Sequence, residues 1–133
     1  MRILIVDGQG GGIGRQLVEA LRKAGERDIT CVGTNALATV AMLKAGATRA
    51  ATGENAVLVA CRRAEVIAGP MGIVLADALL GEVTPAMAVA IAQSAARRVL
   101  IPVEGCGTAV VGVQAGEGTS RLIEQAVDAI LDR

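Results

Sequence analysis

Apolar residues follow two alternating patterns along this chain. Short unbroken runs of aliphatic residues are typical of strands that helices cover on both faces. Such runs occur at 2–7, 29–32, 66–69 and 99–103, and a short, weaker strand is predicted at 48–51. Between them, apolar positions recur every three or four residues, as on one face of a helix. The segments with this spacing lie at 14–24, 35–44, 55–64, 70–80, 85–96 and 120–131. Strands that alternate with helices predict an α/β fold with a mostly parallel sheet.

Residues with known capping preferences mark the ends of several expected helices. Gly25 and Gly46 follow the first two helices, where a left-handed residue often ends a helix. Thr34 or Asn35 is a suitable N-cap for the second helix, and Ser120 is one for the last. These positions support the expected alternation of strands and helices.

The chain length and the element order favour one doubly wound domain. A chain of 133 residues is the size of a single typical domain. The simplest arrangement is a Rossmann-like sheet in the strand order 3-2-1-4-5, and the flavodoxin-like order 2-1-3-4-5 is the alternative. A further apolar run at 108–113 predicts a sixth strand, antiparallel at the sheet edge.

The composition excludes several classes of chemistry. The chain is 53% hydrophobic, yet it contains no Phe, Tyr, Trp or His. Without His, catalysis by Ser-His-Asp or Cys-His groups is excluded, as are His-ligated zinc and iron sites. Without aromatic rings there is no stacking surface for single-stranded nucleic acid. The 13 basic and 13 acidic residues balance, which argues against a basic face for duplex DNA. We therefore expect no nucleic-acid partner.

The hydrophobic content does not predict a membrane protein. The longest charge-free run, 29–43, contains Thr and Asn and is shorter than the ~18 apolar residues of a spanning helix. The apolar run near the start of the chain ends at Asp7, which is too early for a secretion signal. The odd number of cysteines, three, agrees with reduced thiols. We expect a cytoplasmic protein with no membrane partner.

The strongest chemical signal is the glycine-rich segment that joins the first strand to the first helix. It reads Asp-Gly-Gln-Gly-Gly-Gly-Ile-Gly at 7–14. Small residues let the main chain approach an anion, and the amides at a helix start face that anion. One glycine suffices for a tight turn, and each additional glycine has an entropic cost. A phosphate-bearing ligand, held by the amides of 10–14, therefore explains this segment better than a ligand-free turn.

The start of this segment resembles the short-chain dehydrogenase/reductase family. The glycine spacing matches that family's Thr-Gly-x-x-x-Gly-Ile-Gly turn, over about the first 25 residues of the chain. The resemblance implies that Gly8, Gly12, Ile13 and Gly14 line a dinucleotide pyrophosphate, which makes a nucleotide such as NAD(P) the expected cofactor.

Three differences from that family separate the chain from a dehydrogenase. The family's Tyr-x-x-x-Lys pair is impossible in a chain without Tyr. The residues after the second strand, Gly-Thr-Asn at 33–35, include neither an acid for a ribose diol nor an Arg for a 2′-phosphate. Asp7 stands where the family has Thr. The features therefore favour ligand binding without a dehydrogenase's catalytic residues.

The whole chain also resembles a family of short bacterial proteins, domain of unknown function 3842. The matching runs are Asp-Gly-Gln-Gly-Gly-Gly-Ile-Gly, Gly-Thr-Asn-Ala-Leu-Ala-Thr, Ala-Thr-Gly-Glu-Asn-Ala, Gly-Pro-Met-Gly-Ile and Gly-Glu-Val-Thr-Pro-Ala-Met-Ala. This resemblance implies a single Rossmann-like domain over 1–133 and no particular activity.

The expected site lies outside the carboxyl ends of the strands, where open α/β sheets bind ligands. The loops expected there are polar and rich in glycine. The residues predicted to contact the ligand are Gly8, Gln9, Gly10, Gly11, Gly12, Ile13, Gly14, Thr34, Asn35, Glu54, Asn55, Gly69, Pro70 and Met71. Among them, Asn35, Glu54 and Asn55 would contact a sugar or base, and 70–72 would form a wall.

Catalytic candidates are few. Asp7 can act as a base or bind Mg²⁺, but a carboxylate at a strand end more often accepts loop N–H bonds, which is the interpretation we favour. Glu54 is a second acid–base candidate. Cys106, in a Gly-Cys-Gly turn, is the one candidate reactive thiol, with no neighbouring His or Lys in sequence to activate it. We expect no other metal ligand.

These observations favour a protein that binds a small phosphate-bearing ligand over an enzyme, because His, Tyr and Tyr-x-x-x-Lys are missing. One alternative is a small enzyme that uses a bound nucleotide or Mg²⁺, with Asp7 or Glu54 as acid–base. Another is a ligand-free oligomeric interaction scaffold. The apolar segments at 73–80 and 86–92 exceed what one small domain can bury and predict a homo-oligomer, most simply a dimer.

Overall fold

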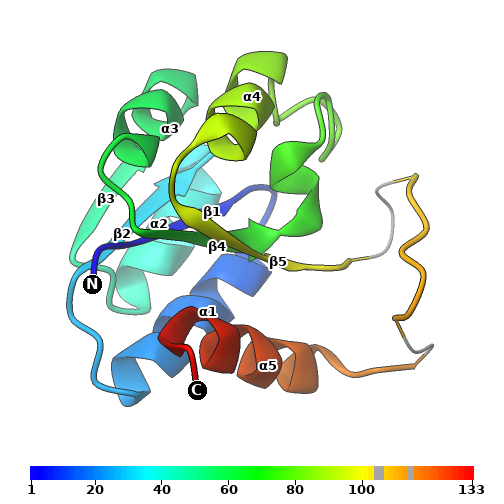
Figure 1. The fold of residues 1–133 in the computed structure, drawn as a ribbon. Helices are drawn as coiled ribbons and strands as arrows, with labels where there is room; N and C mark the ends of the chain where they lie inside the picture. The colour runs from blue at the N-terminus through cyan, green and yellow to red at the C-terminus, as the bar shows by residue number, and fades with distance from the viewer. Residues whose placement is uncertain (104–106, 114–115) are drawn as a thin grey trace.

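A single parallel sheet organises the protein (Figure 1). The computed structural model describes residues 1–103, 107–113 and 116–133. The strands in this part of the chain are β1 (Ile3–Asp7), β2 (Ile29–Gly33), β3 (Arg49–Thr52), β4 (Val66–Pro70) and β5 (Arg97–Ile101). They lie in the order β3-β2-β1-β4-β5, and each neighbouring pair is parallel. The predicted α/β fold and the strand order 3-2-1-4-5 are therefore confirmed, and the alternative order 2-1-3-4-5 is wrong.

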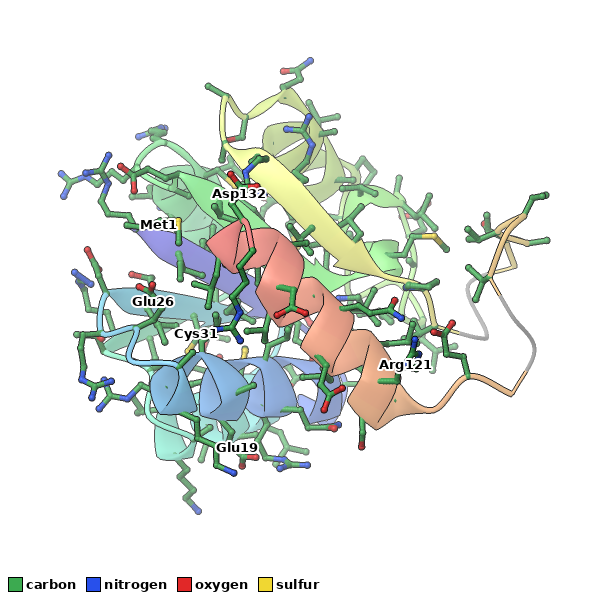
Figure 2. The ribbon with its side chains drawn as sticks, turned by 60° about the horizontal axis from the view of Figure 1, so that its bottom comes forward. Met1, Glu19, Glu26, Cys31, Arg121 and Asp132 are labelled. Atoms are coloured by element: carbon green, nitrogen blue, oxygen red, sulfur yellow. The ribbon has the colours of Figure 1, made fainter. Side chains whose placement is uncertain are left out.

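Helices cover both faces of this sheet. One face carries α1 (Gly12–Lys23), α2 (Ala36–Lys44) and α5 (Thr119–Leu131), and the other carries α3 (Glu54–Cys61) and α4 (Pro85–Gln93). Figure 2 shows α1 and α5 side by side on the first face. Successive residues of a strand point to opposite faces, so Ile3 and Ile5 of β1 join the first core while Leu4 and Val6 join the second.

Short-range signals set most helix ends. Gly25 and Gly46 have φ of 96° and 117°, and each follows the C-cap residue of its helix, as predicted. Asn35 caps α2 by accepting a hydrogen bond from the amide of Ala38. The predicted Ser120 cap is wrong, because Gly118 is the N-cap of α5 and Ser120 lies inside the first turn.

The predicted helix at 70–80 is wrong. Pro70 ends β4, a 3-10 helix η1 (Met71–Val74) follows, and turns lead on to α4. Asp77, Leu79 and Leu80 all adopt positive φ, between 56° and 66°, which breaks helical geometry. The amide of Asp77 donates instead to the carbonyl of Val83, 2.7 Å away. A long-range arrangement of the chain has therefore overridden the helical spacing of the sequence.

The predicted antiparallel strand at 108–113 is also wrong. Residues 107–113 contain no strand, and Val111 is 99% exposed. A valine-rich run has high β-propensity, but it needs a paired neighbour and a covered face to form a strand. Among the described residues, the sheet therefore ends at β5 on this side.

Candidate functional site

The glycine-rich segment forms a tight loop between β1 and α1. The amide of Gly11 donates to the carbonyl of Gly8 over 2.9 Å. Gln9 and Gly11 both adopt left-handed conformations, with φ of 48° and 72°. Left-handed geometry is uncommon for a residue such as Gln, so contacts outside the loop must hold Gln9 in place.

Asp7 holds the loop from beneath. Its Oδ1 accepts a hydrogen bond from the amide of Gly8 at 2.8 Å, and its Oδ2 accepts one from the amide of Gly14 at 2.7 Å. Burial raises the pKa of the Asp7 carboxyl, the amide bonds oppose this, and the charge of Glu82 adds to the rise. Both oxygens thus serve the loop, which is the interpretation favoured for a carboxylate at a strand end.

Three of the glycines are required by the protein itself. A Cβ at Gly8 would lie 2.5 Å from Thr34 Oγ1, and one at Gly14 would lie 2.5 Å from Met42 Sδ. At Gly11, the positive φ and the backbone of Ala38, 2.9 Å from an added Cβ, both exclude a side chain. These positions are explained by packing alone.

Packing does not account for Gly10 and Gly12. An added Cβ at either position would meet nothing within 4 Å, and neither residue has the positive φ that favours glycine. Their amides also make no hydrogen bond to any residue that the structure describes. The loop therefore presents free amides and a bare main chain toward open space.

That open space is a depression of about 320 Å³ at the carboxyl ends of β1 and β4. The glycine loop forms one side of it. The residues that complete it from other elements are Gln16, Pro70, Leu79, Val103 and Thr119. No acidic residue of α1 itself lies in its first turn, but the Asp7 carboxylate accepts the amide of Gly14 there. The depression therefore combines the amides of Gly10 and Gly12, which can donate to an anion, with the apolar side chains of Pro70, Leu79 and Val103.

Glu82 is a site residue that no sequence motif indicated. Its Oε1 accepts hydrogen bonds from the amide of Gln9 at 2.8 Å, from Thr34 Oγ1 at 2.6 Å and from Asn35 Nδ2 at 2.8 Å. Burial raises the pKa of the Glu82 carboxyl, but these three donors outweigh it and the pKa is lowered. Its partners lie at least 47 residues away in sequence, so no local pattern could have revealed this role.

Thr34 and Asn35 lie next to the glycine loop, as the expected site requires. Asn35 Nδ2 also donates to the carbonyl of Gln9 at 3.0 Å, while its Oδ1 caps α2. The polar atoms of both residues are therefore engaged in fixing the loop. That Thr34 and Asn35 contact a ligand stays a prediction.

Glu54 and Asn55 lie at the start of α3 and are not among the residues that line the depression. Glu54 Oε1 accepts a hydrogen bond from Thr84 Oγ1 at 2.6 Å, and Thr84 in turn caps α4. Glu54 therefore joins the starts of two helices on the same face of the sheet. The predicted contacts of Glu54 and Asn55 with a sugar or base stay predictions.

The predicted wall after β4 is partly in place. A Cβ at Gly69 would lie 2.1 Å from the carbonyl oxygen of Val6, so glycine lets β4 approach β1. Pro70 lines the depression, and Met71, the first residue of η1, is half-buried. Of the wall, Pro70 is the residue that reaches the site.

The cysteines within the described residues are not reactive groups. Cys31 and Cys61 are buried, and burial raises the pKa of each thiol to about 11. Cys106, the predicted reactive thiol, lies outside the described residues. In the described part of the chain, no three Asp, Glu or Cys side chains gather as metal ligands would. Within the same part, no helix has the length and apolar character that a membrane crossing requires.

Comparisons with known proteins agree with the fold. One solved structure with this fold is a dodecameric FMN-dependent UbiX-like decarboxylase from Escherichia coli O157:H7. It has a TM-score of 0.51 and 19% identity, and the match covers 98% of this chain and 93% of that one. Among proteins with curated descriptions, none matches this chain. The profile of the family described as "Domain of unknown function (DUF3842)" matches residues 2–133, and the chain therefore belongs to that family.

Proposed function

We propose that this protein binds a nucleotide or another small phosphate-bearing ligand in the depression beside the glycine loop. The phosphate would accept hydrogen bonds from the amides of Gly10 and Gly12, because those of Gly11 and Gly14 already donate to Gly8 and Asp7. The apolar atoms of Leu79, Pro70 and Val103 would contact the uncharged part of the ligand.

The observation that carries this proposal is the pair Gly10 and Gly12. Neither glycine is required by its φ or by the packing around it, and the amides of both have no partner among the described residues. A glycine has an entropic cost. Its presence at a position where the fold does not need it is explained by a ligand that contacts the main chain. The position agrees with the general rule for doubly wound sheets, because the loop lies where helices on opposite faces diverge from β1 and β4.

The candidate ligands are nucleotides that carry a phosphate group. The structurally similar decarboxylase is FMN-dependent, which supports including a flavin mononucleotide among the candidates. NAD and NADP stay candidates because the loop resembles a dinucleotide-binding turn. An enzymatic function with Asp7 as base is less favoured, since both Asp7 oxygens accept loop amides.

A thermal-shift panel tests the proposal with FMN, NAD, NADP, ATP and inorganic phosphate. A ligand at 100 times its dissociation constant adds about 2.7 kcal/mol to the free energy of unfolding, which such a measurement detects readily. If none of the five compounds raises the melting temperature, the proposal is wrong.

Substitutions at Gly12 then test whether the ligand binds at the glycine loop. Gly12→Ala should leave the stability of the free protein unchanged or raise it by about 0.5 kcal/mol. The added methyl meets no atom in the folded protein, and alanine lowers the entropy of the unfolded chain. The same methyl should weaken binding, and Gly12→Val should abolish it. Ala86→Val, at an exposed position in the first turn of α4, is the matched control and should bind normally. Normal binding by Gly12→Val would remove the loop from the site.

A further inference from the structure

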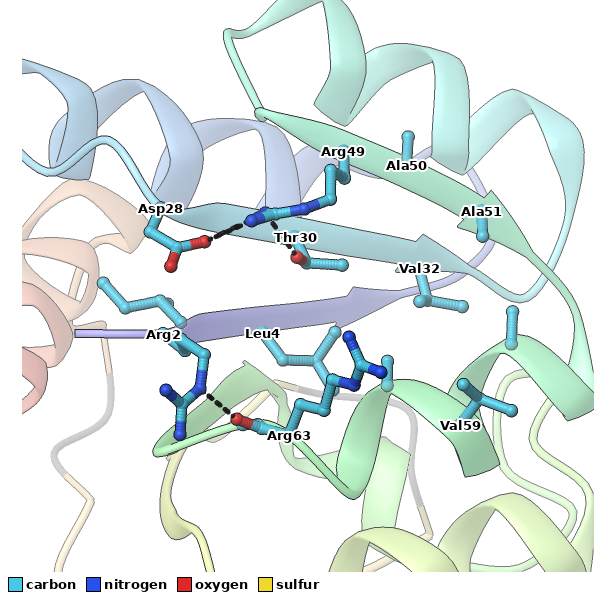
Figure 3. A pocket seen from close by; sticks show the side chains of 14 residues that line it. Arg2, Leu4, Asp28, Thr30, Val32, Arg49, Ala50, Ala51, Val59 and Arg63 are labelled. Carbon is cyan, nitrogen blue, oxygen red and sulfur yellow. Dashed lines mark hydrogen bonds and ion pairs between the residues drawn. The ribbon is translucent and has the colours of Figure 1, made fainter.

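A second and larger hollow lies on the face of the sheet that carries α3 (Figure 3). It measures about 490 Å³ and runs between the β1-β2-β3 part of the sheet and α3. Arg2, Asp28 and Arg49, at or next to the amino ends of these strands, stand at one end of it. It shares no lining residue with the depression beside the glycine loop. We call this hollow the arginine groove.

The arginine groove is open because small side chains line it. Ala56, Ala60 and Ala64 follow one another at intervals of four residues on the side of α3 and its end that borders the groove. Ala51 on β3 and Val59 on α3 are exposed at its sides. A wall of alanine methyls leaves a volume that a longer side chain would otherwise fill, so the groove has apolar walls and no occupant from the described part of the chain.

The charges around the groove are not all paired. Arg49 Nη1 and Nη2 donate to Asp28 Oδ1 at 2.9 and 2.8 Å, and Arg2 Nη2 lies 3.6 Å from Glu65 Oε1. The guanidinium of Arg63 makes no hydrogen bond or ion pair with any described residue. Figure 3 shows its side chain lying along the groove, between α3 and the sheet. The groove therefore combines apolar walls with one cation that has no partner among the described residues.

We propose that the arginine groove binds a small molecule that has an aliphatic chain and a single carboxylate. The chain would lie against Ala51, Val59 and Ala60, and the carboxylate would pair with the planar guanidinium of Arg63, whose donors match carboxylate geometry. The volume falls within the range of small-molecule sites. This site is independent of the proposed phosphate site, which lies at the opposite ends of the strands.

Calorimetry with hexanoate, octanoate and decanoate, all below their micelle concentrations, tests the proposal. Affinity should rise roughly fourfold for each methylene that enters the groove and then level off when the chain fills it. Because Arg63 is exposed, its charge pair is screened by water, and Arg63→Gln should weaken octanoate binding roughly fivefold. Arg62→Gln, the exposed neighbouring arginine outside the groove, should not change it.

Two leucine substitutions test whether the groove itself holds the alkanoate. Ala60→Leu fills the groove and should abolish alkanoate binding, and Ala51→Leu does the same from an exposed position where the fold is at little risk. Gly12→Val should bind alkanoates normally, which separates this site from the phosphate site.

Four results would overturn the arginine groove as an alkanoate site. Three concern binding: decanoate does not bind, decylamine binds equally well, or binding survives both leucine substitutions. The fourth is a lower molar mass in solution for Ala51→Leu, since the groove would then be a contact between two copies of the chain.

Discussion

Asp7 and Glu82 hold the glycine loop in different ways. Asp7 lies at the end of β1 and binds amides one and seven residues further along the chain. Glu82 reaches the same loop from a turn that is 73 residues away from Gln9, and it also binds the loop after β2. The first interaction is local and could be proposed from the sequence. The second depends on the path of the chain after β4, where the helical spacing of the sequence gave a wrong prediction.

The pH dependence of stability should report the role of Glu82. Its pKa is lowered in the folded protein, so the ionised carboxylate contributes stability that is fully present above the ordinary value of 4.5. This contribution is lost as the pH falls through the lower folded-state pKa. Glu82→Gln should therefore be less stable than the original protein at pH 7, and the difference should shrink toward pH 3. Urea unfolding across this range measures it.

The matched control for this experiment is Glu124→Gln, which removes one negative charge from an exposed position on α5. It should follow the original protein at each pH. Asp7 contributes with the opposite sign, since its pKa is raised and the folded state regains stability as the pH falls through that value. Because the charge of Glu82 adds to the raised pKa of Asp7, Glu82→Gln also lessens this Asp7 contribution, which opposes the expected penalty at pH 7. A Glu82→Gln penalty that stays constant from pH 7 to pH 3 would contradict the assigned role.

At the scale of elements, α1 is positioned by close packing at Gly14. A Cβ there would lie 2.5 Å from Met42 Sδ of α2 and 2.9 Å from Cβ of Asp7. The glycine thus lets the first turn of α1 approach both β1 and α2. Gly12, two residues earlier, faces open space. The two glycines stand in one helical turn and should respond to substitution in opposite ways.

Gly14→Ala should destabilise the protein by about 1–3 kcal/mol, the usual cost of forcing an extra methyl into a packed core. Gly12→Ala serves as the comparison and should cost nothing. Truncation of the neighbour in Met42→Ala should relieve part of the Gly14→Ala penalty, so the double variant should be more stable than the sum of single effects implies. Chemical denaturation of the four proteins measures this coupling. Additive effects would show that the contact with Met42 does not set the spacing of the two helices.

The segment after β4 shows how element prediction failed. Its apolar residues have helical spacing, yet Asp77, Leu79 and Leu80 adopt left-handed conformations. Each such residue costs energy, which contacts elsewhere must offset. Those contacts include Leu79 at the depression and Glu82 on the loop. These contacts join residues far apart in sequence. The spacing of apolar residues within a ten-residue segment therefore cannot predict them.

At the scale of the whole molecule, exposed apolar side chains gather on the outer side of α2. Leu37, Val40 and Leu43 are 69%, 45% and 48% exposed, and they recur at intervals of three residues on one helix. Contiguous exposed apolar surface is a common feature of protein contacts. The sequence predicted an oligomer on the basis of the apolar segments at 73–80 and 86–92. The outer side of α2 is a further apolar surface through which two copies of the chain could associate.

We predict that the protein is a homodimer in solution through α2. Light scattering coupled to size exclusion, at micromolar concentration, should give the mass of two chains. The double variant Leu37→Lys with Leu43→Lys should give the mass of one chain while keeping its melting temperature within a few degrees, because both side chains are exposed. If the original protein has the mass of one chain, this prediction is wrong.

The sequence by itself determined the fold class and the position of the glycine loop, and it left two strand orders open between which the structure decided. Unbroken aliphatic runs, helical spacing and glycines at helix ends act over a few residues, and their physical effects depend little on distant parts of the chain. The tertiary structure alone decided which glycines packing requires, which carboxylate crosses between loops, and where alanines leave a groove open. Each of these depends on atoms brought together from distant positions: Gly8 with Thr34, Gln9 with Glu82, and Ala51 with Ala60.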